Sequence, residues 1–215
     1  MIWRIMICLL IGYGFGCIST GYIVGKSQKV DIRKYGSGNV GTTNALRTLG
    51  KRAALITLLG DILKCAVPVL LVKCLIFNEL PYTELLGLYT ALGAVLGHNF
   101  PFYLKFKGGK GIAVLVGTIL TFDWRIFLIC IATFFIILLL TQYVSVGSLV
   151  MEVEFVIGVA ITRPGNFHML CISLIFAVLA FYTHRGNIKR LLNGTENKIG
   201  RKVQIVSEKS GEKNE

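Results

Sequence analysis

Seven apolar segments recur between Trp3 and Thr183, separated by short polar stretches. They cover residues 3–24, 53–77, 83–97, 111–122, 125–142, 144–161 and 167–183. A helix that crosses a bilayer needs about 20 apolar residues, so the shorter segments must continue into their flanks or tilt. Turn-forming residues divide the segments, for example at Asn78–Pro81 and Arg163–Asn166. The pattern predicts an all-α membrane protein, a bundle of about seven transmembrane helices.

Composition and charge placement set the class and the orientation. The 215 residues are 54% hydrophobic and 16% charged, with a mean hydropathy of +0.68, which excludes an ordinary soluble domain. Three stretches, 25–52, 98–111 and 184–215, hold 18 of the 23 basic residues but only 5 of the 11 acidic ones. Basic stretches stay in the cytoplasm. We therefore expect the N-terminus outside, the C-terminus cytoplasmic and seven spans between them.

The apolar runs leave no room for a separate soluble domain. We expect a single polytopic membrane domain over residues 1–206, followed by a polar, disordered cytoplasmic tail at 207–215. The first segment is retained as a span, because its positive flank follows the apolar run, the reverse of a signal peptide. All six cysteines lie in apolar segments without metal-ligand spacing. We expect them to be small core residues, with no metal and no cofactor.

Two pairs of charged residues lie near the middle of apolar segments. Asp61 and Lys64 are three residues apart, so they form a pair that either neutralises itself or reaches a cytoplasmic site from about two helical turns below. Glu152 and Glu154 lie about 200° apart on a helix, so at least one of them faces an unfavourable environment. The sequence offers no role for these two glutamates.

The first basic stretch contains a glycine-rich segment from Gly36 to Arg47, GSGNVGTTNALR. It matches a dinucleotide fingerprint by letter, but no buried strand precedes it, so we reject a Rossmann interpretation. Glycines let backbone N–H groups turn toward an anion, and we expect Thr43 or Asn44 to cap a helix that begins near Ala45. The alternative is a plain connector with Arg47 at the lipid headgroups.

The second basic stretch runs from Gly97 to Gly111, GHNFPFYLKFKGGKG. Three lysines around a Gly-Gly pair, directly before an apolar helix, favour a cationic nest for a phosphate at a helix N-terminus. It is not a Walker A loop, because glycine follows Lys110 where serine or threonine is required. The alternative is a polybasic surface attracted to anionic lipid, which would not need the glycines.

The third basic stretch runs from Thr183 to Lys198. His184 and Asn187 are three residues apart and share a helical face, while the apolar residues that follow give the helix a side that can lie at the membrane interface. A membrane-edge histidine is either an interfacial hydrogen-bonding residue or a chemical group. The spacing alone leaves both interpretations open for His184.

These three motifs resemble the cytoplasmic motifs of the bacterial membrane glycerol-3-phosphate acyltransferase family that uses acyl phosphate. The segment GDILK at residues 60–64 is also similar, and the resemblance covers nearly the whole chain in order. The sequence departs from the family pattern at three positions. Thr42 stands where alanine is usual, Thr183 where a basic residue often precedes the histidine, and Gly186 where an acid is common.

The resemblance implies seven spans and transfer of a fatty acyl group from acyl phosphate to the 1-hydroxyl of glycerol 3-phosphate. The products would be lysophosphatidate and phosphate, in the first step of phospholipid synthesis. It further implies a multi-pass protein of the bacterial plasma membrane with its active site on the cytoplasmic face. Its expected partners are the two substrates, membrane lipid and the enzyme that makes acyl phosphate, with no nucleic acid.

The resemblance also implies roles for the matched residues. The catalytic residues would be Ser37, Arg47, His184 and Asn187. The residues that bind substrate or phosphate would be Gly38, Asn39, Thr43, Asn44, His98, Lys105, Lys107, Gly108, Gly109, Lys110 and Gly111. Glu196 would support the structure.

Physical chemistry fits these roles. Arg47 and the lysines would offset the charge of two phosphates, and Ser37 would donate a hydrogen bond to a phosphate or to the developing oxyanion. Either His184 or the substrate's own phosphate dianion would take the hydroxyl proton. Two other classes remain open from the residues: a small transporter of a phosphorylated solute, and a non-catalytic lipid-binding scaffold.

Overall fold

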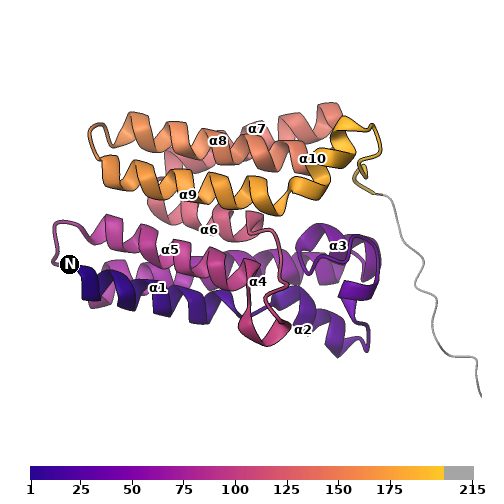
Figure 1. Ribbon diagram of the computed structural model, residues 1–215, viewed down its shortest axis with the longest axis horizontal. Helices are drawn as coiled ribbons and strands as arrows, with labels where there is room; N and C mark the ends of the chain where they lie inside the picture. Colours follow the sequence, from indigo (N-terminus) through magenta and orange to yellow (C-terminus); the bar gives the residue numbers. More distant parts are fainter. Residues whose placement is uncertain (201–215) are drawn as a thin grey trace, which may run out of the picture.

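The computed structural model describes residues 1–200, which form one bundle of helices (Figure 1). All regular secondary structure in that part of the chain is helical. The α-helices are α1 (Ile2–Gly16), α2 (Thr20–Ser27), α3 (Thr42–Thr48), α4 (Lys51–Leu71), α5 (Thr83–Asn99), α6 (Ile112–Phe122), α7 (Trp124–Thr141), α8 (Val144–Thr162), α9 (Phe167–Thr183) and α10 (Arg185–Leu192). Three short turns, η1 (Ile32–Lys34), η2 (Val72–Ile76) and η3 (Phe102–Leu104), lie between them. The tail predicted at 207–215 lies outside the described residues.

Each of the seven apolar segments forms helix, as the sequence predicts. Four helical stretches within residues 1–200 are long and apolar enough to cross a bilayer, namely 2–27, 51–76, 124–141 and 144–162. A fifth is obtained if α9 and α10, which meet at a 59° bend, count as one span. The first segment is broken at residues 17–19, where α1 gives way to α2. α5 and α6 are shorter, with 17 and 11 residues.

Close contact between α1 and α5 depends on four glycines, two on each helix. A methyl group on Gly12 or Gly16 would overlap the backbone oxygen of Thr90 or Ala94, and one on Gly93 or Gly97 would overlap the backbone of α1. Small residues that let helix backbones approach in this way stabilise membrane bundles, where lipid supplies no hydrophobic driving force between helices. The glycines therefore fix α5, and with it the second motif that follows α5.

A core of aromatic rings joins the other half of the bundle. Phe155 on α8 lies between Phe122 of α6 and Phe176 of α9, with ring centroids 5.7 and 6.0 Å away in edge-to-face geometry. Both Phe155 and Phe176 are fully buried. Such pairs add to the free energy gained from burial.

The three motifs gather at one end of the bundle. In Figure 1, α2, α3 and α10 lie together at the right, opposite the N-terminus. The chain between α8 and α9 turns at the N-terminal end, far from α10. Motifs that are up to 150 residues apart in sequence are therefore neighbours, as a shared site requires.

Four of the six cysteines expected in the core are buried there. Cys8, Cys17, Cys65 and Cys130 are buried as expected, but Cys74 and Cys171 are exposed, because they lie on outward helix faces. Glu152 is buried on α8, and its Oε2 atom has no hydrogen-bond partner among the described residues. Nothing in the structure explains a carboxyl group at that position.

Substitution of Gly16 by alanine tests the contact between α1 and α5. The added methyl group would force the helices apart, which we expect to cost about 1–3 kcal/mol and to lower the midpoint of thermal unfolding in detergent. Gly14 is the matched control, because no atom lies within 4 Å of a methyl group built there. A Gly16→Ala midpoint equal to that of Gly14→Ala would contradict the assignment.

Candidate active site

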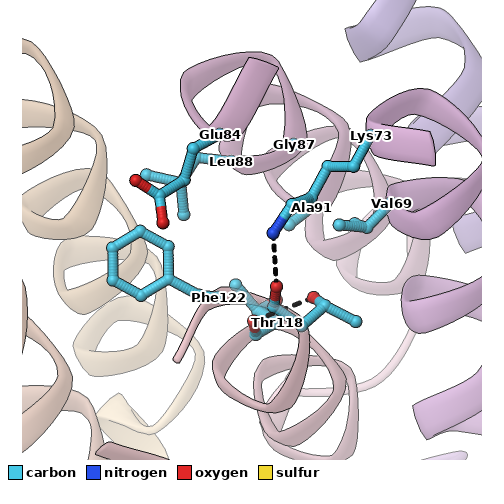
Figure 2. A pocket seen from close by; sticks show the side chains of 9 residues that line it. Val69, Lys73, Glu84, Gly87, Leu88, Ala91, Thr118 and Phe122 are labelled. Atoms are coloured by element: carbon cyan, nitrogen blue, oxygen red, sulfur yellow. Dashed lines mark hydrogen bonds between the residues drawn. The ribbon is translucent and has the colours of Figure 1, made fainter. Parts of the chain in front are cut away.

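A cavity with room for a substrate lies among the described residues. It measures about 490 Å³ and lies between the first motif, the third motif and helices α4, α6, α7 and α8. A second cavity, toward the opposite end, is about 10 Å³ and has space for a single water molecule (Figure 2). Lys73 reaches into this small cavity and donates a hydrogen bond to the Thr121 carbonyl oxygen, 2.8 Å away. Because the second cavity is too small for a substrate, the larger cavity is the candidate site.

The first motif is held in shape by the side chain of Asn44, which is 1% exposed. Its Nδ2 atom donates to the carbonyl oxygens of Ile32, Tyr35 and Asn39 at 2.8–3.2 Å, and its Oδ1 accepts from the Ser37 N–H at 2.9 Å. Because Nδ2 carries two hydrogens, one of them is shared between two of these carbonyl oxygens, and the amide contacts four backbone groups of the loop in all. This arrangement places Ser37 at the cavity edge and Arg47 one turn along α3 from Asn44.

The helix of the first motif begins earlier than expected. α3 starts at Thr42, with Gly41 at its N-cap position and no capping side chain. The expectation that Thr43 or Asn44 caps a helix starting near Ala45 is therefore wrong. Asn44 lies within the helix, and its amide hydrogen-bonds to the backbone of the preceding loop instead. These contacts form only when the loop is folded, so the sequence could not predict them.

The second motif contributes its last two residues to the cavity, Lys110 and Gly111. Gly108 and Gly109 lie just behind them, where their N–H groups donate to the carbonyl oxygens of Asn99 and His98 at 3.0 Å. Their N–H groups are therefore engaged within the loop.

Two lysines of the same motif take a different position. Lys105 and Lys107 are exposed and do not line the cavity. Lys105 and the following Phe106 have positive φ angles of 55° and 58°, which turn the chain out before it returns to α6. Of the three lysines predicted to bind phosphate, Lys110 alone reaches the cavity.

Lys110 is the cation at the centre of the polar end. Its Nζ atom donates to Asn187 Oδ1, and the Thr183 hydroxyl donates to its carbonyl oxygen at 3.3 Å. Burial lowers the pKa of Lys110 from 10.5 to about 8, with Arg190 and Arg47 nearby adding to this and Glu196 opposing it. The ammonium group is therefore charged at neutral pH but loses its proton more readily than an exposed lysine.

The third motif is organised around the carboxylate of Glu196. Its Oε1 accepts from Asn187 Nδ2 at 2.7 Å and from the Ser145 hydroxyl at 3.2 Å, while its Oε2 accepts from Arg190 Nε at 2.8 Å. Asn187 is thereby held from both sides, by Lys110 at its oxygen and by Glu196 at its nitrogen. Such a network fixes the orientation of the amide.

His184 follows α9 directly and is 2% exposed. Its Nδ1 lies 2.8 Å from the Ala180 carbonyl oxygen, so Nδ1 carries the proton and Nε2 keeps a lone pair. Burial, and then the charge of Lys110, lower the pKa of His184 to about 4. The imidazole is therefore neutral at neutral pH and a weak base.

An apolar arm extends the cavity away from these polar groups. Its α7 wall is a stripe of five side chains at helical spacing, and α4, α6 and α8 supply the other walls. The stripe consists of Phe127, Ile131, Phe134, Phe135 and Leu138. One cavity thus combines a cationic end with a hydrocarbon-lined arm.

Comparisons with known proteins agree with this geometry. A family model described as glycerol-3-phosphate acyltransferase matches residues 6–194. The chain is 44% identical to the glycerol-3-phosphate acyltransferase of Thermoanaerobacter pseudethanolicus over 197 residues, which cover 91% of this chain and 96% of the relative. It is also 44% identical to that of Clostridioides difficile over 209 residues, 94% of this chain and 99% of the relative.

Solved structures give the same answer. A crystal structure of the integral membrane glycerol 3-phosphate acyltransferase PlsY, in its glycerol 3-phosphate form, superposes with a TM-score of 0.83 at 31% identity. That comparison covers 91% of this chain and 96% of the other. A lysophosphatidic acid form of PlsY gives a TM-score of 0.81 at 30% identity, covering 92% and 96%.

The chain belongs to the glycerol-3-phosphate acyltransferase family. It is an integral membrane acyltransferase that acts on glycerol 3-phosphate in phospholipid synthesis. This membership favours the enzyme over the transporter and the scaffold, which the residues alone left open.

The structure places most of the residues that the family resemblance singled out around one cavity. Those that line it are Ser37, Asn39, Thr43, Asn44, Arg47, His98, Lys110, Gly111, His184, Asn187 and Glu196. Gly38, Lys105, Lys107, Gly108 and Gly109 do not line it. Within residues 1–200 no group of His, Cys, Asp or Glu side chains is arranged to hold a metal ion.

Sequence reasoning did not assign several polar residues of the cavity lining to the site, among them Asp61, Ser145 and Arg190. Arg190 is three residues after Asn187 and six after His184, so helical spacing could have found it. The sequence left two roles open for Asp61, to neutralise Lys64 or to reach the cytoplasmic site, and the structure places it in the cavity lining. Ser145 has no signal in sequence, because its contact with Glu196 spans 51 residues.

Replacing Asn44 with aspartate tests the loop brace in this acyltransferase. A carboxylate cannot donate, so three carbonyl oxygens lose their partner, and we expect the loop around Ser37 to open. A cysteine in place of Val40, which is 1% exposed in the same loop, should then react at least about tenfold faster with a maleimide than it does when Asn44 is present.

Asn166→Asp is the matched control for that labelling. The Asn166 side chain at the start of α9 only accepts a hydrogen bond, from the Met169 N–H at 3.1 Å, and a carboxylate can accept it equally. Unchanged labelling at position 40 in Asn44→Asp would show that the amide does not hold the loop.

Proposed function

We propose that this protein transfers a fatty acyl group from acyl phosphate to the 1-hydroxyl of glycerol 3-phosphate, forming lysophosphatidate and phosphate. The observation that carries the proposal is the single cavity with a cationic end and an apolar arm. One substrate is a water-soluble phosphate monoester and the other is a lipid with a phosphate head. A cavity of this composition can hold the phosphates at one end and the acyl chain along the other.

The chemistry at the polar end supports transfer in one step. The hydroxyl oxygen of glycerol 3-phosphate bonds to the acyl carbonyl carbon, the bond from that carbon to the phosphate oxygen breaks, and inorganic phosphate leaves. Arg47 and Lys110 would offset the negative charge, and Ser37 would donate a hydrogen bond to a phosphate or to the developing oxyanion. Phosphate is a good leaving group, so an acyl-enzyme on Ser37 would add a step without removing a difficult one.

The hydroxyl proton needs a base in this reaction. With a pKa of about 4, His184 is a weaker base than a phosphate monoester, whose second pKa is about 6. The lowered pKa of His184 therefore favours the substrate's own phosphate dianion as base, and neutral His184 would orient the acceptor through Nε2. Asn187, held by Lys110 and Glu196, is placed to orient the same substrate.

We also propose that the chain crosses the bacterial plasma membrane seven times, with the motif end of the bundle in the cytoplasm. Two features support this orientation. α3 and α10, which belong to the first and third basic stretches, lie at the same end of the bundle (Figure 1). The second basic stretch lines the same cavity through Lys110. A single cytoplasmic face is what the positive-inside rule requires of all three.

An assay on the purified protein tests the proposal. Palmitoyl phosphate and radiolabelled glycerol 3-phosphate should give labelled lysophosphatidate, and Ser37→Ala should lower the turnover number about 100-fold or more. Palmitoyl coenzyme A, supplied at the same concentration, identifies the donor. Labelled lysophosphatidate formed with palmitoyl coenzyme A but not with palmitoyl phosphate would refute the proposed donor. A palmitoyl group found on Ser37 when acceptor is absent would refute direct transfer.

The pKa of Lys110 predicts how activity depends on pH. Below about pH 8 its ammonium group is charged and can bind a phosphate, whereas above that pH it becomes neutral. We expect kcat/KM for glycerol 3-phosphate to fall about tenfold per pH unit on the alkaline side. Lys110→Arg, which keeps its charge in this range, should remove that decline even if it lowers the plateau. A wild-type profile that stays level from about pH 7.5 to 9.5 would show that Lys110 does not bind the acceptor.

A further inference from the structure

The apolar arm of the cavity ends against packed side chains. Among the described residues, its lining on α7 runs from Leu138 to Phe127. On α6 the lining stops at Val116, and on α8 it stops at Met151. One turn further along α8 stands Phe155, which is 0% exposed and belongs to the core. The arm is therefore closed at the Phe127 end.

Phe127 forms the floor of the arm. Its ring packs against the largest core cluster of the bundle, which contains the edge-to-face rings of Phe122, Phe155 and Phe176. A close-packed core has no free volume to offer a ligand. An apolar chain that enters the arm and reaches Phe127 therefore meets a barrier that cannot move aside.

Contacts between α7 and α8 show which residues share a level in the bundle. The two helices are an antiparallel pair joined by residues 142–143 (Figure 1). Cys130 Sγ lies 3.9 Å from the Met151 carbonyl oxygen, and a methyl group on Gly147 would lie 2.9 Å from the Phe134 ring. Counting along both helices from these contacts places Leu138 beside the first turn of α8.

The arm therefore begins at the polar groups, and its depth can be given. Ser145, in the first turn of α8, donates to Glu196 at 3.2 Å. Leu138 and Phe127 are 11 residues apart, which is about 16 Å along a helix. An extended acyl chain lengthens by about 1.25 Å per carbon, because its single bonds of about 1.5 Å meet at tetrahedral angles. About 13 carbons thus fit below the polar end.

We infer that Phe127 is a specificity-determining residue, which limits the acyl chain of the donor to about 16 carbons. The inference rests on the proposed function and adds the length of the chain to it. With the carbonyl carbon among the polar groups, a chain of about 14 to 16 carbons fills the arm. Each buried methylene strengthens binding up to that length. A longer chain has to bend or leave carbons outside.

A competition among donors tests the floor. Equimolar myristoyl, palmitoyl and stearoyl phosphate are supplied with glycerol 3-phosphate, and the lysophosphatidates are quantified by mass spectrometry. We expect the wild-type protein to form at least about tenfold more palmitoyl than stearoyl product, as a hydrophobic pocket discriminates by methylene groups. Phe127→Ala removes the ring and should bring these two products to within about twofold of each other.

Ile131→Phe tests the same arm in the opposite direction. Ile131 lines the arm one turn nearer the polar end, so a ring there raises the floor by about 6 Å, or about five carbons. With lauroyl phosphate added to the mixture, the ratio of palmitoyl to lauroyl product should fall at least about tenfold relative to the wild type. This variant leaves the Phe127 packing intact, so it keeps the inference testable if Phe127→Ala does not fold.

Phe135→Ala is the matched control. It removes the same ring from the side of the arm, where Phe135 is 53% exposed, and it should keep the wild-type ratio of palmitoyl to stearoyl product. Wild-type ratios in both Phe127→Ala and Ile131→Phe would overturn the inference and show that the chain leaves the cavity sideways into lipid. Failure of the proposed function is distinguishable, because no acyl phosphate of any length would then give product.

Discussion

The site depends on satisfying loop backbone groups at the edge of a membrane bundle, where buried polar atoms without partners are costly. Side-chain amides and carboxylates supply these hydrogen-bond partners. Asn44 holds four backbone groups of the first motif, and Glu196 ties the segment after α10 to Asn187 and Arg190. The residues proposed to meet substrate, Ser37 and Lys110 among them, are positioned by these contacts rather than by regular secondary structure.

The packing of the bundle serves the same arrangement. Glycines on α1 and α5 bring the two helices into backbone contact, which fixes the end of α5 where the second motif begins. The edge-to-face rings of Phe122, Phe155 and Phe176 join α6, α8 and α9, and α9 leads directly into His184. Each motif therefore follows a helix whose position is set by close packing on neighbouring helices.

Much of the fold could be predicted, because hydropathy marks helices in a membrane protein: all seven apolar segments are helical. The break between α1 and α2 and the bend after α9 were not predictable, since they depend on tertiary contacts. In the site, the three motifs predicted most of the polar residues that line the cavity. Sequence could not show that Lys105 and Lys107 turn outward, because positive φ angles at Lys105 and Phe106 carry no local signal. Nor could it show that Asn44 braces a loop.

Because of the apolar arm, the two substrates would reach the site from different phases, one from water and the other from the lipid bilayer. Glycerol 3-phosphate would meet the polar end from a volume of water, whereas the acyl donor would enter the stripe of α7 side chains from a film of lipid. The donor's effective concentration is then its mole fraction in that film, and added inert lipid would dilute it as added buffer dilutes the acceptor. The single-chain product would be released into the same film, where it remains confined to two dimensions.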